Sequence, residues 1–211
     1  MRERPGFGRG ALAWRWGSTI PLMSTIESLL LRATDIAPGP VMGRALELSE
    51  AGDPTNRDRF DPGHFTASGF VISPDGSSLL LIHHRRLNRW LQPGGHIDPE
   101  DPSPIVAAAR EVEEETGVAT EPLASRLIDL DIHSIPARDP EPEHEHFDLR
   151  FAFRALDARL IADDEVNDVV WVPWADVETY NVDESVLRGA VALRKACSSP
   201  VTGSLAPPDR R

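Results

Sequence analysis

The stretch from Pro104 to Gly117 constrains the fold most, because its residues fall into a regular pattern only on an α-helix. At about 100° per residue, two sets of side chains occupy separate faces about 110–120° apart. The apolar face carries Ile105, Ala108, Ala109 and Val112, and the acidic face carries Glu111, Glu114 and Glu115. We therefore predict a helix from Pro104 to Thr116, capped by Gly117, that packs one face on a core and presents three carboxylates beside it.

Three carboxylates at i, i+3 and i+4 repel one another by a few tenths of a kcal/mol per pair, and a bound cation removes that cost. Mg²⁺ and Mn²⁺ prefer such oxygen ligands. The ordinary alternative is an exposed acidic face with only Arg110 and solvent as partners. Two neighbours favour a metal site: Gly94-Gly95 lets backbone approach a ligand closely, and Arg110 can hold a carboxylate in a bidentate fork.

Composition restricts the class of protein. The chain has 211 residues, 40% of them apolar, which suits one domain with extensions. Its single cysteine, Cys197, excludes an internal disulfide and cysteine-rich zinc modules, and it indicates a reducing compartment, hence a cytoplasmic location. A formal charge of −12 argues against binding a nucleic-acid polymer. No apolar run is long enough to span a membrane.

Four ranges follow from the chain's local composition. We predict a disordered extension at residues 1–22, a helical N-terminal extension at 23–62, the main domain at 63–197 and a loose tail at 198–211. The extension contains helices at 24–33, opened by a capping box with Ser24 as N-cap, and at 41–51. Either Met1 or Met23 is the true start.

The remaining pattern alternates between strands and helices. Strands are predicted at 64–73, 77–84, 90–92, 126–135, 145–155 and 168–172, and further helices at 174–180 and 184–197. Pro74-Asp75-Gly76 is a turn signal between the first two strands. Strands with few, dispersed helices predict an α+β fold, arranged as an α/β/α sandwich.

Residues 94–118 resemble the Nudix box, GX₅EX₇REUXEEXGU with U apolar. Arg110-Glu111-Val112, Glu114-Glu115 and Gly117-Val118 match its second half without exception. The chain is thereby identified as a member of the Nudix hydrolase family over roughly residues 64–197. One departure is a single-residue insertion between Gly95 and Arg110, which leaves open whether Asp101 or Glu100 fills the first acidic position.

The resemblance implies a Nudix fold, with a mixed central sheet and a smaller antiparallel sheet between helices. It also implies metal-dependent hydrolysis of a diphosphate bond in a nucleoside diphosphate-linked (NDP-X) small molecule, with Mg²⁺ or Mn²⁺ as cofactor. By resemblance the metal ligands are Glu111, Glu114, Glu115, the Gly94 carbonyl and, six residues before Trp171, Glu165. Arg110 joins the three box glutamates as a catalytic residue, and Glu111 is either a ligand or the base that activates water.

Substrate contacts are predicted from weaker signals. Arg85 and Arg86 end a strand before the box and can clamp a phosphate. His146 and Arg150 share one face of a strand and are expected to line the substrate pocket. His144, His146 and Asp148 are also spaced as transition-metal ligands, but no fourth ligand is evident for a zinc site. Asp131 and His133 are expected to be a paired histidine and carboxylate.

Two other functions are compatible with the same fold. A catalytically silent Nudix domain that senses a nucleotide or nucleotide-sugar would be indicated by loss of box carboxylates, and none is lost. A diphosphate isomerase would need an active-site cysteine, whereas Cys197 lies in the last helix. The expected partner is a small, nucleotide-derived phosphorylated substrate, and no membrane is expected; the resemblance also implies a second copy in a homodimer.

Overall fold

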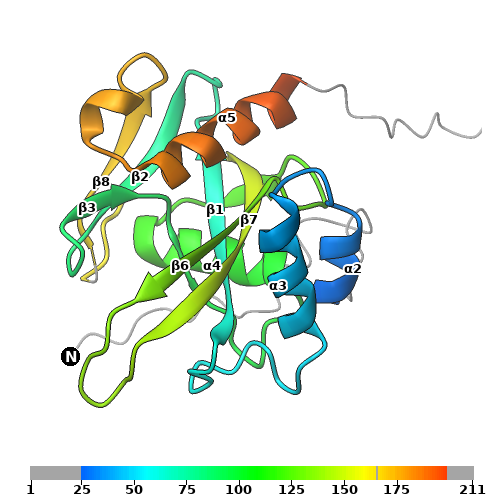
Figure 1. Cartoon of the computed structure of the whole chain (residues 1–211). Helices are drawn as coiled ribbons and strands as arrows, with labels where there is room; N and C mark the ends of the chain where they lie inside the picture. Colours follow the sequence, from blue (N-terminus) through cyan, green and yellow to red (C-terminus); the bar gives the residue numbers. More distant parts are fainter. Residues whose placement is uncertain (1–24, 165, 199–211) are drawn as a thin grey trace, which may run out of the picture.

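The computed structural model describes residues 25–164 and 166–198, whose strands form one mixed, eight-stranded sheet (Figure 1). The strands are β1 Gly63–Ile72, β2 Ser78–His84, β3 Arg89–Leu91, β4 Gly94–His96, β5 Thr120–Pro122, β6 Asp129–Ile135, β7 His144–Ala155 and β8 Val166–Pro173. β1 and β7 run parallel along the whole of β1, from Gly63 opposite Glu145 to Ile72 opposite Arg154. The other strand pairs of the described residues are antiparallel.

The sheet divides into two parts at the hairpin between β1 and β2. These strands pair only at Ile72 and Leu79, next to the turn at Asp75. Beyond that pair, β1 forms hydrogen bonds with β7 and β4, whereas β2 forms them with β8 and β3. The Asp75 carboxylate holds the turn by accepting bonds from Ser77 N at 3.0 Å and Ser73 Oγ at 2.6 Å. The predicted mixed sheet and smaller antiparallel sheet are therefore confirmed.

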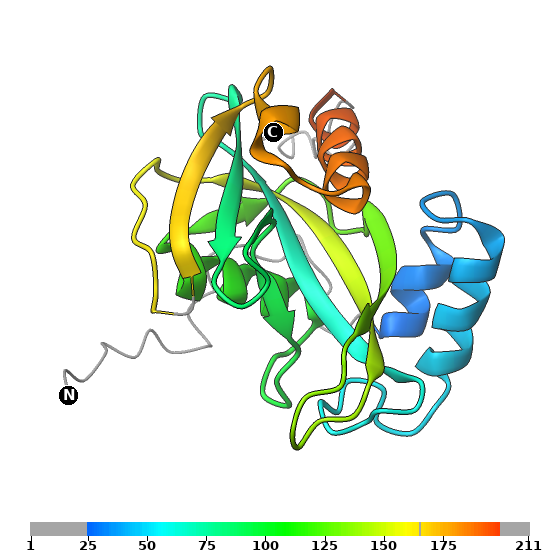
Figure 2. The same cartoon turned by 60° about the vertical axis from the view of Figure 1, so that its left-hand side comes forward.

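Helices cover both faces of the sheet (Figure 2). They are α2 Ile26–Leu31, α3 Gly39–Ser49, α4 Pro104–Thr116 and α5 Glu184–Ser198, with a short 3₁₀ helix, η2, at Val177–Tyr180. Consecutive β1 residues show that α4 and α5 lie on opposite faces. A side chain at Gly69 would meet Val112 of α4, and Phe70 fills the space beside Gly189 of α5. This layering is the predicted α/β/α sandwich.

Each face has its own hydrophobic core. On one face α2, α3 and α4 share a cluster with Phe65, Phe147 and Leu149. On the other face α5 packs on a cluster that includes Phe70, Leu79 and Leu81. Burying one such side chain stabilises the fold by about 1.5–3 kcal/mol, so both layers are firmly attached to the sheet.

Several element boundaries differ from the prediction. The N-cap of α2 is Thr25, whose Oγ1 accepts from Ser28 N at 3.2 Å, and not Ser24, which lies outside the described residues. The predicted helix at 174–180 is only the 3₁₀ turn η2. The short strands β4 and β5 were not predicted, because three residues carry too little alternation to identify a strand. The predicted tails, 1–22 and all but Ser198 of 198–211, also lie outside the described residues.

Among the described residues, no helix is both long enough and apolar enough to cross a membrane. The predicted division into an extension at 23–62 and a main domain at 63–197 stays a prediction.

Candidate active site

Helix α4 has the predicted bounds and the predicted orientation. Pro104 opens its first turn, and Gly117 ends it in the left-handed conformation, at φ 70°, with its N–H donating to Glu113 O at 2.9 Å. Ile105, Ala108, Ala109 and Val112 are buried against the sheet. The packing of this apolar face sets the direction in which the glutamates point.

Arg110 is the centre of the carboxylate cluster. Its side chain is only 7% exposed, and its NH1 donates to Glu111 Oε1 at 2.8 Å and to Glu114 Oε2 at 2.9 Å. Its NH2 donates to the His96 carbonyl at 2.9 Å, which connects α4 to the end of β4. Burial alone would lower the pKa of Arg110, but the hydrogen bonds that it donates to Asp101 and the charge of Glu111 raise it above its usual range, so the guanidinium is permanently charged.

Asp101, and not Glu100, is the acidic partner of that guanidinium. Both its oxygens accept from Arg110, Oδ2 from NH2 at 2.9 Å and Oδ1 from Nε at 3.1 Å, and its side chain is 1% exposed. Asp101 also accepts from Asp98 N at 2.9 Å, which closes the loop before α4. The one-residue insertion is therefore taken up within this loop, and Glu100 lies on its exposed side.

Glu111 is pressed against the backbone of β4. A Cβ on Gly95 would lie 2.7 Å from Glu111 Cδ, so this close approach requires glycine. Burial raises the pKa of Glu111 to about 7; the charge and hydrogen bond of Arg110 oppose the shift, and nearby Glu114 and Asp98 add to it. The carboxylate is thus less stable as an anion here than in water.

The other two glutamates differ in exposure. Glu115 is buried, and its Oε2 accepts from Gly94 N at 2.9 Å. The side chain of Glu114 is 49% exposed. Gly94 therefore lies directly beside the cluster, as its predicted role as a metal ligand requires. The predicted ligand atom is its carbonyl oxygen, whereas the hydrogen bond to Glu115 is made by its N–H.

The donor set fits hard divalent ions. Glu111, Glu114 and Asp101 pair with one guanidinium, and Glu115 lies beside Gly94, which leaves excess negative charge on oxygen atoms, the ligands that Mg²⁺ and Mn²⁺ prefer. The loop before β8 passes the C-terminal end of α4, where Asp163 N donates to Glu115 O at 3.3 Å. Glu165, the predicted additional ligand on this loop, lies outside the described residues.

Arg150 lies in a buried ion-pair network under α5. Its side chain is 2% exposed and pairs with Asp129 at 2.9 Å, Asp148 at 2.8 Å and Asp131 at 3.3 Å. It also donates to the Ser185 carbonyl on α5 at 3.0 Å. A substrate contact by Arg150 would have to break these bonds, so the arginine holds α5 on the sheet in the structure described here.

Asp148 lies next to Arg150 on the same polar face of the sheet. It accepts from Ser68 Oγ at 2.8 Å and from Gln92 Nε2 at 3.3 Å. The expected pair of His133 and Asp131 is present at 3.1 Å. The sequence did not indicate Ser68 and Gln92, because their meeting depends on the pairing of strands.

Arg85 and Arg86 lie in the turn that follows β2. Arg85 contacts the start of β8, with bonds to Asn167 Oδ1 at 3.3 Å and Val166 O at 3.4 Å. Arg86 is exposed and donates its backbone N–H to His84 Nδ1 at 3.2 Å. Arg85 therefore borders the loop that contains Glu165, and a phosphate contact by either arginine stays a prediction.

A hollow of about 430 Å³ lies on the smaller antiparallel part of the sheet. It is lined by His83, Asn88, Arg89, Trp90, Thr179, Tyr180 and Asn181. Trp90 packs edge-on against Tyr180 there, with ring centroids 5.1 Å apart. No residue of the carboxylate cluster lines this hollow.

Histidines gather at the end of the sheet next to β4. His64 of β1 and His144 and His146 of β7 each offer one ring nitrogen, and these three nitrogens lie within 4.8 Å of one another. The His96 ring lies beside two of them, 5.2 Å from His64 and 5.5 Å from His146 between centroids. Burial, together with the other histidines, lowers the pKa of His96 to about 4 and that of His146 to about 2. Local sequence spacing does not connect His64 or His96 with this group, because they reach it through the pairing of β1 with β7 and β4.

A family model described as NUDIX domain matches residues 63–190, from β1 into α5. Comparison with curated proteins gives no significant match. A NUDIX family hydrolase from Clostridium perfringens has a similar structure at 23% identity, over 67% of this chain and 97% of that one, with a TM-score of 0.48. The NUDIX domain of Shewanella oneidensis NrtR, solved with ADP ribose, is 21% identical over 73% of this chain and 98% of that one, with a TM-score of 0.47.

Proposed function

Because the chain belongs to the Nudix family, as a pyrophosphohydrolase, we propose that it uses divalent metal ions to hydrolyse a diphosphate bond in a nucleoside diphosphate-linked small molecule. The observation that carries this proposal is the cluster of Glu111, Glu114 and Glu115 on α4, organised by Arg110 beside Gly94 and Gly95. Mg²⁺ is the proposed cofactor, with Mn²⁺ as a substitute.

The three glutamates and the Gly94 carbonyl would hold the ions. Bound there, the ions would neutralise charge that develops on the phosphoryl oxygens during hydrolysis. Arg110 is a positioning residue: its NH2 is fixed by Asp101 and the His96 carbonyl, and its NH1 holds Glu111 and Glu114. Glu111, next to Gly95, is either a ligand or the group that accepts a proton from the attacking water.

The substrate is best identified by a screen with Mg²⁺ and with Mn²⁺. Nucleoside triphosphates, their oxidised forms, ADP-ribose, dinucleoside polyphosphates and coenzyme A are the compounds to compare. Phosphate release should be measured with and without added phosphatase, because cleavage of an NDP-X compound yields two phosphomonoesters rather than free phosphate. Turnover of one of these classes supports the proposal. Tight binding without turnover of any compound would instead indicate a nucleotide sensor.

Glu114→Gln tests the carboxylate cluster directly. The change keeps the shape of an exposed side chain but removes its charge, so we expect turnover to fall by about 100-fold or more, equivalent to about 2.7 kcal/mol of transition-state stabilisation. Glu113→Gln is the matched control, because the same change lies one residue away on α4. Comparable activity in both variants would refute the role of Glu114.

A further inference from the structure

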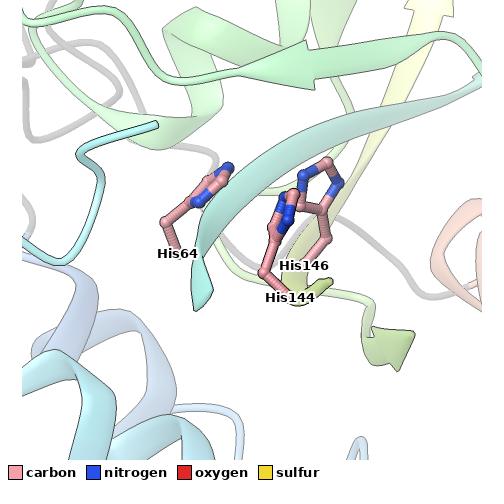
Figure 3. Close-up of side chains that lie close together, drawn as sticks. All are labelled: His64, His144 and His146. Carbon is pink, nitrogen blue, oxygen red and sulfur yellow. The ribbon is translucent and has the colours of Figure 1, made fainter. Parts of the chain in front are cut away.

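Three imidazoles converge at one end of the sheet, on elements that are distant in the sequence (Figure 3). The parallel register sets His64 of β1 directly opposite His146 of β7, and His144 lies two residues earlier on the same face. Their ring centroids are 4.8 Å apart for His64 and His146, 5.2 Å for His144 and His146, and 5.3 Å for His64 and His144.

These separations match those of three histidines around one tetrahedral ion. With a metal–nitrogen distance of about 2.0–2.1 Å and tetrahedral angles, the imidazole centres of three ligands lie about 5.2 Å apart. The ligand nitrogens are already within 4.8 Å of one another, so small rotations of the rings suffice to bring them to a common ion.

Hydrogen bonds prepare two of the rings for metal binding. His64 Nδ1 lies 3.0 Å from the Arg59 carbonyl, and His144 Nδ1 lies 2.8 Å from the Pro142 carbonyl. A carbonyl only accepts, so each Nδ1 carries the proton and each Nε2 keeps a free lone pair. Backbone carbonyls in this position are the usual outer partners of metal-bound histidines.

The Nε2 atom of His64 has no other use in the described part of the chain. His64 is 0% exposed, and its Nε2 is buried without a hydrogen-bond partner among the described residues. Buried polar atoms are normally satisfied, so an unpartnered lone pair on a ring beside two further imidazoles points to a ligand.

We propose that His64, His144 and His146 bind one divalent transition-metal ion, for which Zn²⁺ is the best fit. Neutral imidazole nitrogens suit Zn²⁺, Co²⁺ and Ni²⁺ and bind Mg²⁺ poorly, so this centre differs from the carboxylate cluster in ligand chemistry. Three protein ligands leave a fourth position for water or a substrate oxygen. The His96 ring lies beside the three histidines, with its centroid 5.2 Å from that of His64.

The ion would join parts of the chain that the sheet alone does not hold. Its outer carbonyls, from Arg59 and Pro142, belong to the loops that enter β1 and β7. His96 also links the centre to α4, because its carbonyl accepts from Arg110 NH2. Occupancy is therefore expected to raise the melting temperature and to hold β4 beside the carboxylate cluster.

Calorimetric titration of tag-free, chelator-stripped protein with Zn²⁺ in excess Mg²⁺ tests the proposal. We expect one equivalent to bind, and His144→Asn and His146→Asn to weaken binding by about 100-fold or more, since outer partners alone contribute 10–100-fold. His133→Asn is the matched control, because its ring lies 5.6 Å from His146 but pairs with Asp131. Circular dichroism would establish that each variant is folded.

Co²⁺ provides a second measurement that does not depend on affinity. Bound to three imidazoles in tetrahedral geometry it gives an intense visible absorption, whereas octahedral oxygen ligands give a weak one. Glu114→Gln should leave this spectrum and the Zn²⁺ stoichiometry unchanged. Absence of Zn²⁺ binding, or binding lost in Glu114→Gln but kept in His146→Asn, would overturn the proposal without bearing on diphosphate hydrolysis.

Discussion

At the scale of single residues, Gly95 keeps space for the Glu111 carboxylate. In Gly95→Ala the new Cβ would lie 2.7–2.9 Å from the carboxylate atoms, which are the movable end of a side chain held by Arg110. We expect the fold to survive and turnover to fall by about 100-fold, since a misplacement of about 1 Å in a site can cost that much. Gly43→Ala, which meets nothing within 4 Å, is the control. Full activity in Gly95→Ala would show that the position of Glu111 is not critical.

Asp131 links pH to stability at the same scale. Burial alone would raise its pKa, but the hydrogen bond from His133 and the charge of Arg150 lower it below its usual range. A depressed folded-state pKa means that the stabilisation is complete above about pH 4 and is lost as pH falls below it. Asp131→Asn should therefore cost about 1–2 kcal/mol at pH 7, because one partner, Arg188, is half exposed. Urea unfolding at pH 7 and pH 3 should show this cost shrinking; a constant difference would contradict it.

At the scale of elements, the loop between β7 and β8 runs along the end of α4. Ile161 N donates to Thr116 O at 2.8 Å, and Asp163 N donates to Glu115 O. A carboxylate from this loop can supply the ligands that α4 cannot offer from its own side. We predict that Glu165→Gln lowers metal-dependent turnover well beyond Asp164→Asn, with unchanged melting in metal-free buffer. A larger effect of Asp164→Asn would place the ligand one residue earlier.

At the scale of the whole molecule, the helices α2 and α3 belong to the hydrophobic core on which α4 packs. α2 and α3 bury Leu29, Leu30, Met42 and Leu48 in the same cluster as α4. At about 1.5–3 kcal/mol each, these four side chains contribute as much as the net stability of a typical domain. A chain that begins at Met23 should unfold in urea like the full chain, and one that begins at Gly63 should show no cooperative transition. Cooperative unfolding of the shorter chain would establish residues 23–62 as a separable extension.

The sequence by itself determined the helix that carries the glutamates. Its apolar and acidic faces, its proline start and its glycine end all lie within a few turns, so local spacing decides them, and α4 has the predicted bounds. The strands of the main sheet were also predictable, because long alternating runs such as β1 and β7 are bounded by clear turn signals. β4 and β5 were not, because each has only three residues.

The choice between Asp101 and Glu100 depended on the folded loop, since both are acidic and only one side chain points at Arg110. Tertiary structure alone brought Arg150 into a buried ion-pair network and His64 beside His146. Sequence distance says nothing about these meetings. The first arises from the antiparallel pairing of β6 with β7, and the second from the parallel pairing of β1 with β7 across some 80 residues. Strand register, and not local pattern, decides which side chains of distant strands share a face.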